Sequence, residues 1–282
     1  MSQSYTHENI NVSPRLPVYC FIYEEYKQFT PGHWHDHIEI LYPIEGTLYI
    51  TLNEVEHTIR KEQLFVVNAS EIHSTRSDGH VKILLLQIPY DYLASFIPDF
   101  KLIRFQESFE DANMQNSFSY VMMQQQLSSL IRIYSEQEYG YELAFMAQLH
   151  NFLHTLYVRF STRLEHIEKE PKHIARLKDV LNYISEHYAE PISLKDVSAL
   201  AALNPEYFCR AFKRCTGITL LEYINQIRLN HIYSELISTQ DSITDILERN
   251  GFTNYKVFSR MFKEHYGKTP SALRESLKSS PG

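Results

Sequence analysis

Two stretches of the sequence decide the fold: FCRAFKRCTGIT at residues 208–219 and FSRMFKEHYGKT at residues 258–269. They agree at six positions with one fixed offset of fifty residues. Agreement of this density indicates an internal repeat rather than chance, so this part of the chain holds two copies of one structural unit.

Each copy is predicted to be a pair of helices joined by a tight turn. The first helices are expected at residues 194–202 and 243–249, each preceded by a serine suited to the N-cap position. Turn residues follow at 203–205 and 250–254, and the duplicated stretches supply the second helices. This order is that of the helix-turn-helix unit.

The spacing of side chains gives the second helix of each copy two faces. Phe208, Ala211 and Phe212 share one face, as do their counterparts in the second copy, and this face is expected to be buried. The other face carries the predicted DNA contacts, which are Glu206, Cys209, Arg210, Lys213, Lys256, Val257, Ser259, Arg260 and Lys263. The alternative is a solvated charged surface, but Arg and Lys recur at matched positions, which favours a helix that fits the major groove.

An apolar run at residues 220–237 joins the two copies and is predicted to be one helix. Eighteen helical residues span roughly 27 Å. With the turns added, the two second helices would lie about 34 Å apart, which is one turn of B-DNA. One chain is therefore expected to enter two successive major grooves of a single duplex.

The segment around the second copy resembles the signature of the AraC/XylS family of bacterial transcription regulators. The matching positions are Arg228-Leu229, Ser242-Ile243, Ile246, Gly251-Phe252, Phe258-Ser-Arg260, Phe262-Lys263, Gly267, Thr269-Pro270 and Arg274. The resemblance covers residues 174–278. It implies a sequence-specific regulator, an activator by family habit, that binds double-stranded DNA and contacts RNA polymerase. Leu247 and Ile232 depart from the family pattern, because both are larger than the usual residue where helices pack closely.

The N-terminal part of the chain has a different pattern. Short β-branched or aromatic runs at 18–23, 38–42, 47–52, 63–67 and 81–88 predict a β-sandwich or small barrel. Two helices follow, with apolar stripes from Phe118 to Tyr134 and from Leu143 to Leu164, which either pack on the β domain or form the seam of a homodimer. The sequence thus predicts an α+β, two-domain chain: an effector-binding domain at 1–164, a linker at 165–173 and a helical DNA-binding domain at 174–282.

The run His33-Trp34-His35-Asp36-His37-Ile38-Glu39, followed by six residues and Gly46, resembles the first cupin motif. His73 stands where the second cupin motif has its histidine, although the Pro-x-Gly of that motif is absent. Regulators of the AraC/XylS type commonly carry a cupin-like effector domain at this end. The resemblance implies a cupin-like β-barrel that binds a small-molecule effector.

On a single strand, alternate residues from His33 to Glu39 would share one face. The predicted effector site consists of His33, Trp34, His35, His37, Glu39, Tyr42, Tyr49 and His73. Aromatic rings beside hydrogen-bonding groups suit a sugar. No cofactor is expected, but a divalent metal at His33, His35, Glu39 and His73 is the alternative, either in a metal-sensing regulator or in a metal-dependent cupin enzyme. Enzymatic activity is not expected, because no further catalytic group accompanies these residues.

Charge and composition agree with this division. Residues 171–282 carry 15 Lys and Arg against 12 Asp and Glu, whereas residues 1–170 carry 12 against 22. A basic C-terminal part favours nucleic acid at that end only. Three cysteines without C-x-x-C spacing, no apolar membrane-spanning run and no signal peptide predict a cytoplasmic protein without a membrane partner.

Overall fold

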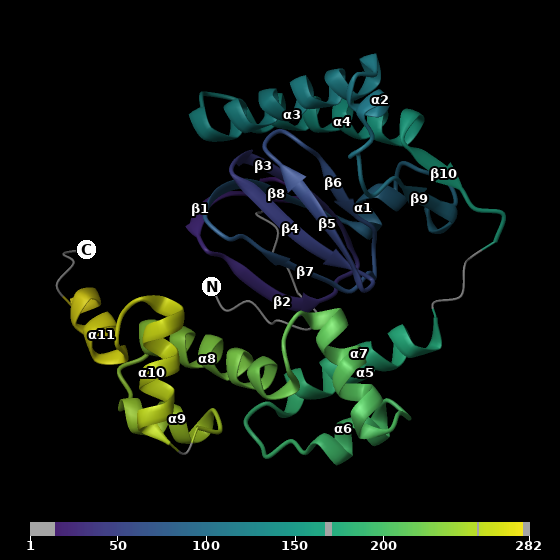
Figure 1. The fold of residues 1–282 in the computed structure, drawn as a ribbon. Helices are drawn as coiled ribbons and strands as arrows, with labels where there is room; N and C mark the ends of the chain where they lie inside the picture. The colour runs from purple at the N-terminus through teal and green to yellow at the C-terminus, as the bar shows by residue number, and fades with distance from the viewer. Residues whose placement is uncertain (1–14, 167–170, 253, 279–282) are drawn as a thin grey trace. The chain divides into compact units, whose positions relative to one another are not determined.

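The computed structural model describes residues 15–166, 171–252 and 254–278. The chain divides between Pro171 and Lys172 into two compact units, called here the N-terminal and the C-terminal unit (Figure 1). Parts of the predicted effector domain (1–14), linker (167–170) and DNA-binding domain (279–282) lie outside the described residues. The last predicted linker residues, Lys172 and His173, begin a helix instead.

The N-terminal unit contains two four-stranded antiparallel sheets, with strand orders β1-β8-β3-β6 and β2-β7-β4-β5. The strands are β1 (Tyr19–Tyr26), β2 (Phe29–His33), β3 (His37–Glu45), β4 (Thr47–Leu52), β5 (Val55–Arg60), β6 (Phe65–Val67), β7 (His73–Arg76) and β8 (His80–Pro89). The five predicted strands correspond to β1, β3, β4, β6 and β8. Sequence reasoning missed β2, β5 and β7, because β2 contains Pro and Gly and the other two are rich in polar residues.

Strict alternation along the strands gives the first sheet two different faces. Ile38, Ile40 and Tyr42 belong to a large core shared with the helices of this unit. Leu41 belongs to a second core, which includes inward residues of the other sheet such as Ile50. The second core therefore lies between the two sheets, and Glu39 points into this interior because it alternates with Ile38 and Ile40.

The outer face of the first sheet is covered by α3 (Phe118–Glu136) and α4 (Tyr141–Arg159), which pack against each other (Figure 1). This arrangement confirms the predicted helices, although α4 ends before Leu164. The remaining short elements are α1 (Tyr90–Ala94), η1 (Phe100–Leu102), β9 (Ile103–Phe105), α2 (Ala112–Gln115) and β10 (Ser161–Arg163).

Within its described residues the C-terminal unit contains helices and no strand, as predicted. Its helices are α5 (Lys172–His187), α6 (Leu194–Leu200), α7 (Pro205–Thr216), α8 (Leu220–Ser238), α9 (Ile243–Arg249), α10 (Tyr255–Tyr266) and α11 (Pro270–Lys278). The side chains of Ser193, Asn204 and Ser242 accept backbone N–H groups at the starts of α6, α7 and α9. These hydrogen bonds fix where each helix begins.

Helix α8 joins the two helix-turn-helix units. Its 19 residues span about 29 Å. The core of the second unit includes both departures from the family pattern, because Ile232 and Leu247 are buried there with Phe258 and Phe262. The larger side chains are therefore accommodated in the core. The separation of the two second helices on DNA stays a prediction. Within the described residues, no helix is both long and apolar enough to cross a membrane.

The segment that follows α5 contacts α8 and the turn of the second helix-turn-helix unit. Arg228 Nε donates to the carbonyl of Tyr188 at 2.6 Å, and Arg228 Nη2 donates to the carbonyl of Glu190 at 2.9 Å. Gly251, in the turn after α9, has a φ of +76°, and a Cβ built on it would lie 2.5 Å from the Ala189 carbonyl oxygen. Glycine is therefore required there for its backbone conformation and for its lack of a side chain.

Replacing Gly251 tests this contact. Gly267, with a φ of +71° and nothing within 4 Å of a built Cβ, supplies a matched control. Gly267→Ala should lower the free energy of unfolding by about 1–2 kcal/mol, the cost of the left-handed conformation. Gly251→Ala should cost a further ~1–3 kcal/mol, because the Ala189 carbonyl must move.

Urea unfolding of the full chain, followed by far-ultraviolet circular dichroism, measures both losses. Fluorescence of Trp34, the one tryptophan in the sequence, reports the N-terminal unit and should not change. Equal losses for the two variants would contradict the packing of Gly251 against Ala189.

Candidate DNA interface and effector site

Helix α7 has the two faces that its sequence predicts. Phe208 and Phe212 are fully buried, with ring centroids 5.4 Å apart, and Phe212 meets Tyr223 of α8 edge to face. The four predicted contact residues of this helix are all exposed: Glu206, Cys209, Arg210 and Lys213. The aromatic pair holds α7 on its core while the opposite face stays open to solvent.

Helix α10 repeats this arrangement. Phe258 and Phe262 are fully buried, again with centroids 5.4 Å apart. The side chain of Asn254 accepts the backbone N–H groups of Lys256 and Val257, both at 3.1 Å, which fixes the start of the helix. Four of the five predicted contact residues of this helix are exposed, namely Lys256, Val257, Arg260 and Lys263. The fifth, Ser259, is half-buried.

Helices α7 and α10, called here the reading helices, each present arginine and lysine on a face opposite a buried aromatic pair. Long cationic side chains on an exposed helix face can reach phosphates and the edges of guanine bases. The N-terminal unit contains the second candidate site.

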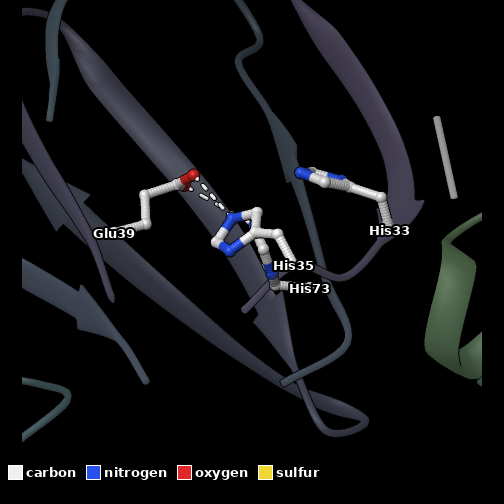
Figure 2. Close-up of side chains that lie close together, drawn as sticks. All are labelled: His33, His35, Glu39 and His73. Atoms are coloured by element: carbon white, nitrogen blue, oxygen red, sulfur yellow. Dashed lines mark hydrogen bonds and ion pairs between the residues drawn. The ribbon is translucent and has the colours of Figure 1, made fainter. Parts of the chain in front are cut away.

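Four buried side chains gather between the two sheets of the N-terminal unit: His33, His35, Glu39 and His73 (Figure 2). One ligand atom from each lies within 4.8 Å of the ligand atoms of the other three. His33 ends β2, Glu39 lies in β3 and His73 begins β7. The two facing sheets therefore contribute to one group, called here the histidine cluster.

The prediction that His33, His35, His37 and Glu39 share one face of one strand is wrong. The chain bends at Asp36, so His33 ends a strand of the second sheet and His37 begins a strand of the first. His35 lies between the strands, and its ring is turned toward Glu39. His37 is half-buried and is not one of the four residues whose ligand atoms gather.

Each imidazole of the cluster has one nitrogen committed to the backbone. The Nδ1 atoms of His33, His35 and His73 lie 3.0, 3.2 and 3.0 Å from the carbonyl oxygens of Pro31, His37 and Glu71. Because a carbonyl only accepts hydrogen bonds, each Nδ1 must carry the hydrogen.

Two of the Nε2 atoms face the Glu39 carboxylate. His35 Nε2 lies 3.0 Å from Oε2, and His73 Nε2 lies 3.5 Å from Oε1. Gln87 Nε2 donates to the same Oε2 at 2.7 Å. No local sequence pattern marks Gln87, which lies 48 residues from Glu39 and reaches it through the pairing of β8 with β3.

Burial and neighbouring charge set the ionisation of the cluster. Burial, with smaller effects of His73 and His35, lowers the pKa of His33 to about 3, so this imidazole is neutral. Burial alone would raise the pKa of Glu39, but His73 and His35 outweigh it, and the pKa of this carboxyl lies well below its usual value. Glu39 is therefore a carboxylate facing two imidazole nitrogens.

The predicted aromatic lining does not join the cluster. Tyr42 lies on the opposite face of β3 from Glu39 and is buried in the core shared with the helices. Tyr49 alternates with the inward residues Leu48 and Ile50, and its ring stacks under the Arg76 guanidinium at 4.0 Å. Including Tyr42 and Tyr49 in the effector site was wrong, because on a strand only every second residue shares a face. Trp34, which stands between His33 and His35 in the sequence, is half-buried.

The chain matches two family models, one over each unit. Residues 15–153 match the family model described as the AraC-like ligand binding domain, and residues 197–276 match a helix-turn-helix domain. The chain belongs to the AraC/XylS family. It is accordingly a regulator that binds DNA through its C-terminal unit and a small-molecule effector through its N-terminal unit.

Two relatives of this AraC/XylS regulator align over most of its length. The uncharacterized regulator YdeC of Bacillus subtilis is 24% identical over 92% of both chains. The transcriptional activator RhaS of Enterobacter sp. is 24% identical over 97% of this chain and 95% of its own. Among solved structures, ToxT of Vibrio cholerae aligns over 92% of this chain and 98% of its own, with 14% identity and a TM-score of 0.43.

Two arginines test the prediction that α7 and α10 contact bases in the major groove of DNA. Arg210→Ala and Arg260→Ala should each weaken binding to a DNA site selected from a random pool by ~1–3 kcal/mol at fixed salt, through lost base contacts. Both side chains are exposed, so the melting temperature should not change.

Arg132→Ala, on an exposed position of α3, removes the same charge from the other unit and serves as control. Unchanged DNA affinity in both reading-helix variants, or an equal loss in the control, would rule out the proposed contacts.

Proposed function

We propose that this chain is an AraC/XylS regulator whose effector site is built around a divalent metal ion held by the histidine cluster. The observation that carries the proposal is the orientation of the imidazoles. All three direct Nδ1 to backbone carbonyls, which leaves their Nε2 atoms for the interior that holds Glu39. Metal-binding histidines are typically oriented in this way, by a hydrogen bond from the nitrogen that does not bind the metal.

The donor set also suits a metal ion. His35 and His73 direct Nε2 at a carboxylate that accepts but cannot donate, so a positive charge must lie among these atoms. A divalent cation bound by three imidazoles and a carboxylate supplies that charge. Nitrogen and oxygen donors in this proportion favour a first-row transition metal. Bound there, the ion would polarise an effector oxygen and link the two sheets.

The further features of the function rest on the family and on the sequence. We propose that the protein acts in the cytoplasm, as a homodimer, and activates transcription by contacting RNA polymerase. The prediction of a sugar as effector loses support, because two of the aromatic rings that favoured it lie outside the interior. We infer a sensor rather than an enzyme, because the relatives that align over the full chain are regulators.

Metal content of the purified full chain tests the proposal. The expected result is about one first-row metal ion per chain, lost in His35→Ala and in Glu39→Gln. His37→Ala is the matched control, since His37 neighbours the cluster in sequence but is not part of it. Removal of the metal with a chelator should lower the melting temperature, because bound metal stabilises only the folded state.

The same preparations connect the metal to DNA binding. Affinity for the selected DNA site should differ between metal-loaded and metal-free wild-type protein, and should not respond to loading in Glu39→Gln. Absence of stoichiometric metal from protein supplied with Mn²⁺, Fe²⁺, Co²⁺, Ni²⁺ or Zn²⁺ would refute the metal centre. Steady turnover of a small molecule would instead favour the cupin enzyme.

A further inference from the structure

A second polar group lies in the interior of the N-terminal unit, apart from the proposed metal ligands. It consists of Gln28, Thr30 and Thr75 and is called here the amide–hydroxyl group. Gln28 and Thr75 are 9% and 6% exposed. Gln28 Nε2 lies 2.9 Å from Thr30 Oγ1, 3.3 Å from Thr75 Oγ1 and 3.3 Å from the hydroxyl of Tyr23.

The other end of the Gln28 amide is buried and has no hydrogen-bond partner among the described residues. If the amide oxygen and nitrogen of Gln28 are exchanged, one end of the amide still lacks a partner. The oxygen then faces the three hydroxyl groups, and the nitrogen faces none. A buried polar atom without a partner calls for an explanation, and a ligand that binds there supplies one.

The amide–hydroxyl group lies next to the histidine cluster along the same two strands. Thr30 pairs with Thr75 in the ladder of β2 and β7, and His33 pairs with His73. Thr75 and His73 are two residues apart on one strand, so they share a face and their Cα atoms are about 7 Å apart. That separation suits a small molecule with one end at each group.

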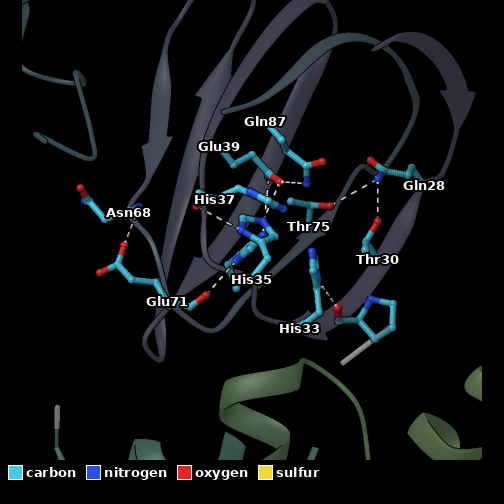
Figure 3. Close-up of polar contacts among 12 residues, drawn as sticks. Gln28, Thr30, His33, His35, His37, Glu39, Asn68, Glu71, Thr75 and Gln87 are labelled. Carbon is cyan, nitrogen blue, oxygen red and sulfur yellow. Dashed lines mark hydrogen bonds and ion pairs between the residues drawn. The ribbon is translucent and has the colours of Figure 1, made fainter. Parts of the chain in front are cut away.

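The two amides of the interior point toward each other in Figure 3, Gln28 from the residue that precedes β2 and Gln87 from β8. The orientation of Gln87 is fixed, because its Nε2 donates to the Glu39 carboxylate. Its amide oxygen is therefore turned away from Glu39. The unpartnered end of the Gln28 amide therefore offers an acceptor oxygen to a ligand that carries a hydrogen-bond donor.

The net charge of the proposed metal site indicates which chemical group the ligand places at the histidine cluster. A divalent ion with three neutral imidazoles and the Glu39 carboxylate leaves one positive charge in a buried site. Buried charge is costly unless it is paired, and a single carboxylate on the ligand would balance it. At the opposite end Gln28 requires a donor, and the threonine hydroxyls both donate and accept, as a ligand hydroxyl does.

We propose that the interior binds a small hydroxylated monocarboxylate, such as an aldonate, with its carboxylate at the histidine cluster and a hydroxyl donated to Gln28. This assignment rests on the proposed metal-centred effector site and names the class of its ligand. Gln28 lies beside the edge of the first sheet, because its Nε2 contacts the hydroxyl of Tyr23 on edge strand β1. Tyr23 is half-buried, and Phe21 on the same strand is 46% exposed.

Titration calorimetry of the metal-loaded full chain tests the ligand class. The probes are glycerate, threonate and gluconate, each beside its deoxy counterpart propionate, butyrate or hexanoate, with glucose as the uncharged polyol. At least one hydroxy acid should bind about tenfold more tightly than its deoxy counterpart, the effect of one buried hydrogen bond. Glucose should bind more weakly than gluconate.

Gln28→Leu should abolish the difference between each hydroxy acid and its deoxy counterpart while metal content stays at the wild-type level. Gln28→Met, of similar length, repeats the test if the first variant folds poorly. Gln124→Leu is the control, because this glutamine lies on α3 and bonds the carbonyl of Glu62 outside the interior. A general loss of stability would weaken all probes together and would leave the difference intact.

The outcomes separate this inference from the proposed function. Stoichiometric metal with no binding of any hydroxy acid overturns the ligand class and leaves the metal centre standing. Equal binding of hydroxy and deoxy acids, or a preference that persists in Gln28→Leu, overturns the role of Gln28. Equal binding of glucose and gluconate overturns the charge argument. Absence of metal, established first, refutes the site on which the inference rests.

Discussion

Two buried phenylalanines on the inner face of each reading helix are the constraint on which the C-terminal unit depends. Phe208 and Phe212 of α7, and Phe258 and Phe262 of α10, are fully excluded from solvent. A helix anchored through one face must present the opposite face outward, and in both copies that face carries arginine and lysine. The orientation of the DNA-binding face therefore follows from packing, because the periodicity that buries the phenylalanines also turns the cationic side chains outward. Hydrogen bonds to side-chain caps fix where each helix starts.

The N-terminal unit depends on a different constraint, the burial of Glu39 between two sheets. A carboxylate in an apolar interior requires partners, and the structure supplies them from both sheets: Gln87 from the neighbouring strand, His73 from the facing sheet and His35 from the bend between strands. Each imidazole is held by the backbone behind it, so its remaining nitrogen is fixed in direction. Donor atoms that are held in place in this way favour the binding of a metal ion. A bound metal ion would in turn let the interior bind an anionic ligand.

Features that depend on neighbouring residues could be predicted from the sequence, and features that depend on which strands pair could not. The faces of α7 and α10 and the serine caps of α6 and α9 all follow from the local sequence. The make-up of the histidine cluster was only partly predictable, because nothing local marks the bend at Asp36 that puts His33 and Glu39 in different sheets. Tyr42 could have been excluded, since it lies an odd number of residues from Glu39 on one strand. Gln28 and Gln87 carry no motif, and only the folded chain brings them to the interior.

The central claim is that one chain holds two reading helices in a fixed relation and applies both to one duplex. The most direct measurement varies the spacing between the two half-sites of a DNA site selected from a random pool and records affinity at fixed salt. A fixed relation predicts that inserting half a helical turn, or a full turn, lowers affinity to that of a single half-site. Affinity that recovers after a full turn, or that never depends on the second half-site, would contradict the account.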